Sequence, residues 1–102
     1  MKFLVVGQGI AGTVLSWVLR KHGAEVVLAD AGFANAASAA AAGIVNPITG
    51  KNYVKSWRID ALLPSAKVVY QQLEQALGIE IWLERPIFRL LSAVQERNNW
   101  DA

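Results

Sequence analysis

Three glycines near the start of the chain have the spacing of a phosphate-binding turn. Gly7, Gly9 and Gly12 form a Gly-x-Gly-x-x-Gly sequence that directly follows an apolar run. In such a turn the first glycine permits a tight bend, the second lets the backbone approach a pyrophosphate, and the third lets a helix pack closely on a strand. The N–H groups at the start of the following helix then attract an anion. The spacing therefore predicts a dinucleotide site.

An acidic residue stands where such a site needs one. Asp30 closes the second apolar run, and a carboxylate at the tip of a second parallel strand can accept hydrogen bonds from ribose hydroxyls. Ala31 follows it, with no basic side chain beside it for the extra phosphate of NADP. We therefore predict an adenine dinucleotide site that disfavours NADP. The alternative is that the glycines serve only packing and that Asp30 begins a loop.

These residues need a strand, a helix and a second strand to position them. Residues 2–6 and 25–29 are short apolar runs typical of buried parallel strands, and residues 10–22 between them have helical periodicity. The pattern predicts an α/β fold with a Rossmann-like βαβ unit. We expect one apolar stripe of this helix to lie on the sheet: Ile10, Val14, Trp17, Val18 and Leu19.

The second half of the sequence predicts a long helix followed by strands. Residues 60–77 keep a helical apolar stripe, and residues 79–83 and 87–91 predict a short antiparallel strand pair. Ser92 and Gln95 have capping-box spacing for a last short helix. We expect residues 1–50 to form the dinucleotide-binding segment and residues 51–102 to begin a second, substrate-binding domain.

Two stretches between these parts leave alternatives open. Residues 34–43 are rich in alanine, which indicates either a short helix or a place where the backbone approaches something flat and bulky. A basic and aromatic group follows, in which a solvated connector is favoured over a surface for an anionic substrate or RNA: Lys51, Tyr53, Lys55, Trp57 and Arg58.

The composition excludes several classes of protein. Of the 102 residues, 54% are hydrophobic and 18% charged, so the chain is globular; it is either a piece of a longer domain or covers part of its surface with another copy. It has no cysteine, no run long enough to span a membrane and no leader-like start, which favours a cytoplasmic protein without a metal site. The net charge of +2 is scattered, which argues against nucleic acid. His22, the only histidine, ends a helix and has a surface role rather than a catalytic one.

Taken together, these motifs resemble a known family. The glycine turn, Asp30 and the Ser38-x-x-Ala-Ala-Gly43 sequence resemble the N-terminal end of FAD-dependent oxidoreductases of the D-amino-acid oxidase and glycine oxidase superfamily. The resemblance extends through residues 43–50, 56–58 and 96–100 to a bacterial branch of that superfamily. It covers essentially the whole chain.

The resemblance implies FAD as the cofactor and assigns roles to named residues. The pyrophosphate would lie against the glycine turn and the start of the helix, at Gly7, Gly9, Ile10, Ala11 and Gly12. The adenosine ribose would lie at Asp30 and Ala31, although the family usually has glutamate at the position of Asp30. Ser38 would bind the phosphates, while Ala42, Gly43 and Ile44 would run beside the flavin.

The family chemistry is oxidation of a C–N bond in an amine or amino acid. The resemblance implies a small-molecule substrate of that kind, and the substrate-binding groups of the family have no counterpart here, so we name no catalytic residue. We expect the chain alone to be inactive. Three alternatives remain: an NAD-binding dehydrogenase domain, which Asp30 supports and residues 38–44 oppose; a non-catalytic subunit of a split oxidase; and an RNA-modifying flavoenzyme.

Overall fold

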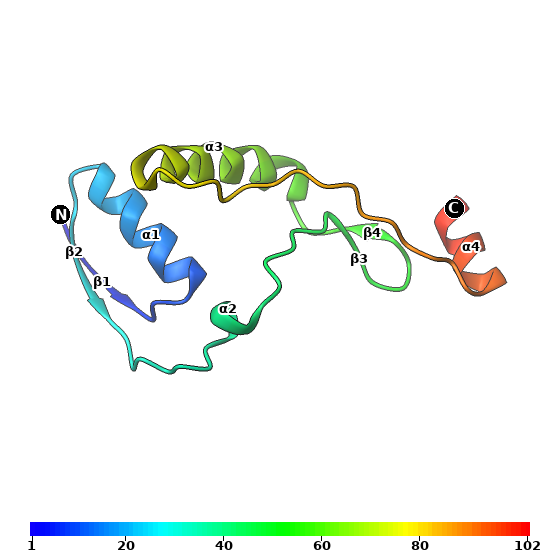
Figure 1. Ribbon diagram of the computed structural model, residues 1–102, viewed down its shortest axis with the longest axis horizontal. Helices are drawn as coiled ribbons and strands as arrows, with labels where there is room; N and C mark the ends of the chain where they lie inside the picture. Colours follow the sequence, from blue (N-terminus) through cyan, green and yellow to red (C-terminus); the bar gives the residue numbers. More distant parts are fainter. The chain divides into compact units, whose positions relative to one another are not determined.

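The computed structural model describes all residues, 1–102, and divides into two compact units, Met1–Ile44 and Val45–Ala102. The first unit contains β1 (Lys2–Val6), α1 (Ile10–Lys21), β2 (Glu25–Ala29) and the short α2 (Ala37–Ala40). The second contains β3 (Ile48–Thr49), β4 (Val54–Lys55), α3 (Ile59–Leu77) and α4 (Val94–Asp101) (Figure 1).

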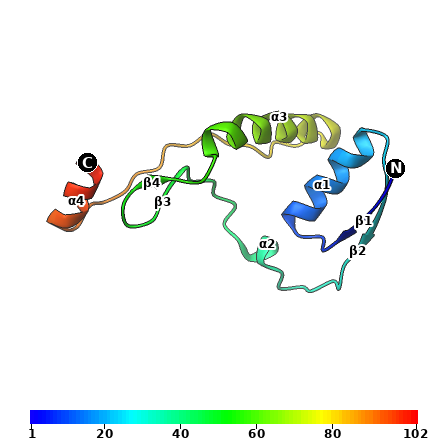
Figure 2. The same cartoon turned by 180° about the vertical axis from the view of Figure 1, so that it is seen from behind.

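The first unit is a parallel strand pair with one helix against it. β1 and β2 pair in the register Lys2↔Glu25 to Val6↔Ala29, and both views show α1 beside the pair (Figure 2). Because side chains alternate along a strand, only one face of β1 is covered. Val5 of β1 and Val26 of β2 are the buried hydrophobic residues, whereas Val6 is 79% exposed. The predicted βαβ unit, its parallel pairing and its α/β class are confirmed.

The apolar stripe predicted the covered side of α1 only in part. Val14, Trp17, Val18 and Leu19 of the stripe are half-buried, but Ile10 at its start is 55% exposed. The buried residue of the helix is Ser16, which the stripe did not include. Small size rather than hydrophobicity decides this position, because a serine lets the helix approach the strands closely. The helix ends at His22 and Gly23 as expected, with the His22 N–H donating to the Leu19 and Val18 carbonyls at 3.1 Å each.

The second unit has a small antiparallel hairpin and a long helix. β3 pairs with β4, with Ile48 opposite Lys55. α3 begins at Ile59, ahead of Pro64, and ends at Gly78, whose left-handed conformation lets its N–H return to the Glu74 carbonyl at 2.8 Å. The antiparallel pair that the sequence predicted therefore exists, but in other residues.

The predicted strands 79–83 and 87–91 are wrong, because neither segment is a strand. The N–H groups of Ile81 and Trp82 both donate to Glu74 Oε1, at 2.7 Å each. Neighbouring N–H groups point in opposite directions in a regular strand, so two that meet on one oxygen rule that conformation out. Tyr70 and Trp82 also pack, with ring centroids 5.3 Å apart, which ties the segment to α3.

The last helix forms, but with a different capping partner. Glu96 rather than Gln95 reaches back, and its Oε2 accepts the Ser92 N–H at 2.8 Å and the Ser92 hydroxyl at 3.1 Å. α4 contacts the hairpin through Trp100, whose ring lies edge-on to Tyr53 with centroids 5.2 Å apart. These contacts hold the ends of the second unit together.

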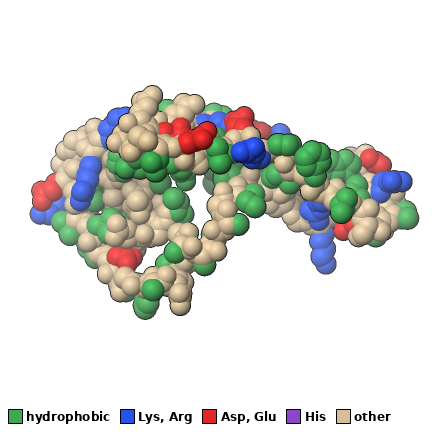
Figure 3. Space-filling view, viewed as in Figure 1, with side chains coloured by type: hydrophobic (Ala, Val, Ile, Leu, Met, Phe, Trp, Pro, Cys, Tyr) green, Lys and Arg blue, Asp and Glu red, His purple; other side chains and the backbone are tan.

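Hydrophobic side chains reach the surface in many places (Figure 3). In the extended segment after α3, Phe88 and Leu90 are 89% and 94% exposed. None of the helices has both the length and the apolar character that a membrane crossing requires.

Candidate functional site: a glycine turn at the carboxyl ends of two strands

The glycine turn joins the end of β1 to the start of α1, and two of its glycines are required by geometry. Gly7 has φ +96°, which other residues rarely adopt, and its N–H donates to the Ala29 carbonyl at 2.8 Å, which extends the strand pairing by one residue. A Cβ on Gly12 would overlap the Gly7 carbonyl oxygen and approach its carbon to 3.0 Å. The helix therefore contacts the turn as closely as a backbone allows.

The start of α1 presents N–H groups that the helix itself does not use. The first helical hydrogen bond runs from the Thr13 N–H to the Gly9 carbonyl at 3.0 Å, so the preceding N–H groups have no helical partner. Gly9 has no side chain to cap them, and the first turn carries no acidic residue. The N–H groups of Ala11 and Gly12 remain available to an anion, favoured by the helix dipole.

Asp30 lies against the glycine turn. The Gln8 N–H donates to its Oδ2 at 2.6 Å, and the Gly32 N–H donates to its Oδ1 at 2.7 Å. Donation from Gln8, and then from Gly32, holds the pKa of Asp30 below its usual value, against a smaller opposing effect of burial. The carboxylate is therefore charged at neutral pH.

Ser38 reaches the turn from the alanine-rich segment. Its Oγ accepts the Ile10 N–H at 3.0 Å, and a Cβ on Gly9 would lie 3.2 Å from that oxygen. Only Ala37–Ala40 of the segment is helical, and the chain leaves it in an extended conformation at Ala41. Of the two alternatives for this stretch, the structure therefore has a single helical turn and a close approach to the glycine turn.

The structure brings most of the predicted site residues together. Around the turn lie Gly7, Gly9, Ile10, Ala11, Gly12, Asp30 and Ser38, with Ala31 in the bend after β2. In the segment after α2, Gly43 has φ +68° and Ile44 is exposed. Ala42, Gly43 and Ile44 are thus near in sequence to Ser38 but have no bond to the turn.

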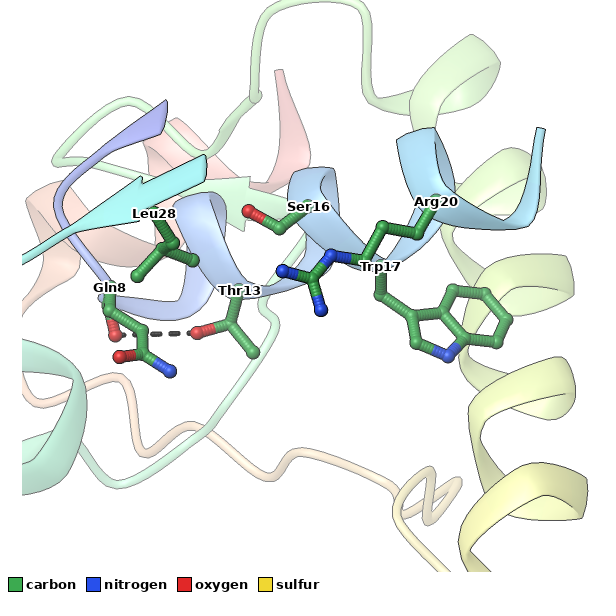
Figure 4. Close-up of a pocket in the computed structure, with 6 residues that line it drawn as sticks. All are labelled: Gln8, Thr13, Ser16, Trp17, Arg20 and Leu28. Atoms are coloured by element: carbon green, nitrogen blue, oxygen red, sulfur yellow. Dashed lines mark hydrogen bonds between the residues drawn. The ribbon is translucent and has the colours of Figure 1, made fainter. Parts of the chain in front are cut away.

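Sequence reasoning missed a pocket that Gln8 lines together with residues of α1 (Figure 4). It has a volume of about 390 Å³ and is lined by Gln8, Thr13, Ser16, Trp17, Arg20 and Leu28. The Arg20 guanidinium donates to the Val26 carbonyl at 3.1 Å. Ser16 is 6% exposed, and its buried hydroxyl has no hydrogen-bond partner. Ser16, a small polar residue in a mostly apolar helix, was the available signal in the sequence.

Three of the basic side chains in the second unit lie against local partners. Lys55 pairs with Asp60 at 3.0 Å, and the Arg58 guanidinium lies over its neighbour Trp57 at 5.3 Å. The Arg89 guanidinium lies 4.6 Å from the centre of the Tyr53 ring. These contacts neutralise or cover the charges locally. No group of residues in the structure has the composition of a metal site.

Comparison with known protein families identifies the family of this chain. The sequence model of the FAD dependent oxidoreductase (DAO) family matches residues 2–102, and the chain belongs to that family. No solved structure matches the chain significantly. The family description supports FAD as the cofactor, and a glycine turn with free helical N–H groups fits the pyrophosphate of a dinucleotide.

Proposed function

We propose that this chain is the FAD-binding part of an oxidoreductase that oxidises the C–N bond of a small amine or amino acid. The observation that carries the proposal is the glycine turn at the start of α1, with the Ala11 and Gly12 N–H groups open to an anion. FAD, when bound, supplies the two-electron acceptor to which hydride from the substrate carbon passes.

The residues of the chain would hold the dinucleotide rather than act on the substrate. The pyrophosphate oxygens would accept hydrogen bonds from the first turn of α1, and Ser38 Oγ stands 3.0 Å from the Ile10 N–H at the same place. Asp30 would accept from the adenosine ribose. Because Ala42, Gly43 and Ile44 have small or apolar side chains and lie free of the turn, their backbone is open to the flavin.

We assign no acid or base of the reaction to the carboxyl groups whose pKa values are displaced. The carboxyl groups with displaced pKa values, Asp30, Glu74, Glu84 and Glu96, all have them lowered by hydrogen bonds within the fold. A carboxyl group used in proton transfer near neutral pH needs a raised pKa instead. We infer that the chain alone turns over no substrate. Oxidation of amines or amino acids by a pure sample supplied with FAD would contradict this.

A second candidate is an NAD-binding dehydrogenase domain, which Asp30 favours because an aspartate at the end of β2 suits the ribose of NAD. Calorimetric titration of the chain with FAD and with NAD separates the two. The flavin proposal expects tighter binding of FAD. Tighter binding of NAD would replace the proposal with the dehydrogenase.

A variant of the turn gives the control for that titration. Gly9→Val would bring side-chain atoms against Ser38 Oγ, which already lies 3.2 Å from the Cβ position, and would block the approach of a phosphate. We expect Gly9→Val to abolish dinucleotide binding without unfolding the chain. Leu15→Val, on the exposed part of α1, is the matched control and should bind as the parent chain does. Undiminished binding by Gly9→Val would mean that the turn serves the fold alone.

A further inference from the structure

We propose that Asp30 and Ser38 brace the glycine turn in its phosphate-binding shape before any ligand arrives, so that both are positioning residues of the turn. This deepens the proposed function and rests on it, since the shape that is held is the one a pyrophosphate would meet. The brace itself consists of contacts within the chain and can be tested without a ligand.

Asp30 provides the first point of the brace. Its Oδ2 accepts the N–H of Gln8, the residue between Gly7 and Gly9, while its Oδ1 accepts the N–H of Gly32 in its own bend. One carboxylate thus joins the two bends that follow β1 and β2. Each oxygen already accepts a hydrogen bond from a backbone N–H. A carboxylate oxygen can accept a second one, so a ribose hydroxyl can still bind there.

Ser38 provides the second point. α1 begins at Ile10 after Gly9, which has no side chain to serve as a cap, and Ser38 Oγ supplies the missing acceptor to the Ile10 N–H from 28 positions further along the chain. A side chain of α2 therefore caps the start of α1. A Cβ on Gly9 would be 3.2 Å from Ser38 Oγ, so the glycine also makes room for the brace.

The two points fall on either side of Gly9. Gln8 precedes it and Ile10 follows it, so the peptide groups around this glycine are held from both ends. A turn with two glycines has many accessible conformations, and ordering them on binding would weaken affinity. A turn that is already ordered avoids this loss.

The brace is tested first by hydrogen exchange of single amides in the chain without ligand. Asp30→Ala removes both acceptors from Gln8 and Gly32, and Ser38→Ala removes the acceptor from Ile10. We expect Asp30→Ala to speed exchange at Gln8 by about threefold to tenfold and leave Ile10 unchanged, and Ser38→Ala to do the reverse. The variants control for each other. Unchanged exchange at Gln8 and Ile10 in their respective variants would overturn the proposal.

The amide of Val18, in the middle of α1, reports whether the fold survives. If Asp30→Ala also exposes Val18, Asp30→Asn replaces it, since asparagine keeps one acceptor oxygen and disturbs the bend less. With that variant we expect faster exchange at Gln8 or at Gly32, whichever loses its acceptor. Parent-like exchange at both would overturn the role of Asp30.

Ligand binding then separates a brace from a ribose contact. The probes are ADP and 2′,3′-dideoxyadenosine diphosphate, which has the same phosphates but lacks the ribose hydroxyls. A brace acts through the turn, so Asp30→Ala should also weaken the dideoxy ligand, by about threefold to tenfold, and the ribose contact of the proposed function adds a further loss for ADP. A loss confined to ADP would overturn the brace and leave Asp30 as a ribose ligand only. Should the parent chain bind neither ligand, the proposed function fails, and the exchange experiment still decides the brace.

Discussion

Replacing Gly12 by alanine sets two opposing effects against each other. Alanine in a helix is favoured over glycine by about 1 kcal/mol, so propensity alone predicts a more stable chain. In this structure, however, the new Cβ would overlap the Gly7 carbonyl oxygen, lie 3.0 Å from its carbon and 3.4 Å from Val5 Cγ1. Two of these are backbone atoms that cannot rotate away, and overpacking of this kind costs about 3 kcal/mol at the upper end of its range. The net expectation is a loss of about 2 kcal/mol.

Thermal unfolding measures the result directly. For a chain of this size a loss of about 2 kcal/mol lowers Tm by roughly 8–16 °C. Leu15→Ala, an exposed change in the same helix, is the control and should stay within about 0.5 kcal/mol of the parent chain. Because relief of the overlap must move the turn, Gly12→Ala should also weaken FAD binding. A raised Tm would show that α1 and the Gly7 carbonyl group are not in such close contact.

Two further predictions concern polar groups away from the glycine turn. Ser16→Ala removes a buried hydroxyl that has no partner, so it should raise the free energy of unfolding by about 1 kcal/mol, measured by urea titration; a loss would mean that Ser16 has a partner in solution. Hydrogen bonds from the Trp82 N–H, and then from the Ile81 N–H, lower the pKa of Glu74 from its usual value of 4.5. The Glu74 carboxylate therefore stabilises the fold fully above the usual pKa, and this stabilisation is lost as the pH falls through the lower pKa of the folded chain. The amide resonances of Ile81 and Trp82 should therefore shift together below pH 4.5 and should not shift in Glu74→Gln.

The first unit could be predicted from the sequence because its signals are local. An apolar run, three spaced glycines and a helical stripe define β1, the turn and α1, and the second apolar run gives β2 within the observed bounds. The stripe did not include Ser16, the buried residue of α1, because close approach of the helix to the strands favours a small side chain there.

The second unit shows where local pattern stops being informative. Residues 79–83 have the composition of a strand, but Glu74, one turn before the end of α3, collects two neighbouring N–H groups and bends the backbone out of that conformation. No propensity of the segment itself contains this contact. The predicted capping partner of α4 was wrong for a related reason. Both Gln95 and Glu96 follow Ser92 closely in the sequence, and the Ser92 N–H donates to Glu96.

The sequence predicted which residues form the candidate site but not the hydrogen bonds among them. Spacing singled out the glycines, Asp30 and Ser38 as groups that meet a ligand. That Asp30 and Ser38 also bond Gln8 and Ile10 depends on how the chain returns to the turn, which no spacing in the sequence expresses.

The central claim is that FAD binds at the glycine turn, and an amide-resolved NMR titration of the chain with FAD tests it most directly. The largest changes in amide resonances are expected at Gly9, Ala11, Gly12 and Asp30, and they should disappear in Gly9→Val. FAD binding at the turn would be contradicted by saturable changes in amide resonances that spare the turn, or by changes at the turn with NAD but not with FAD.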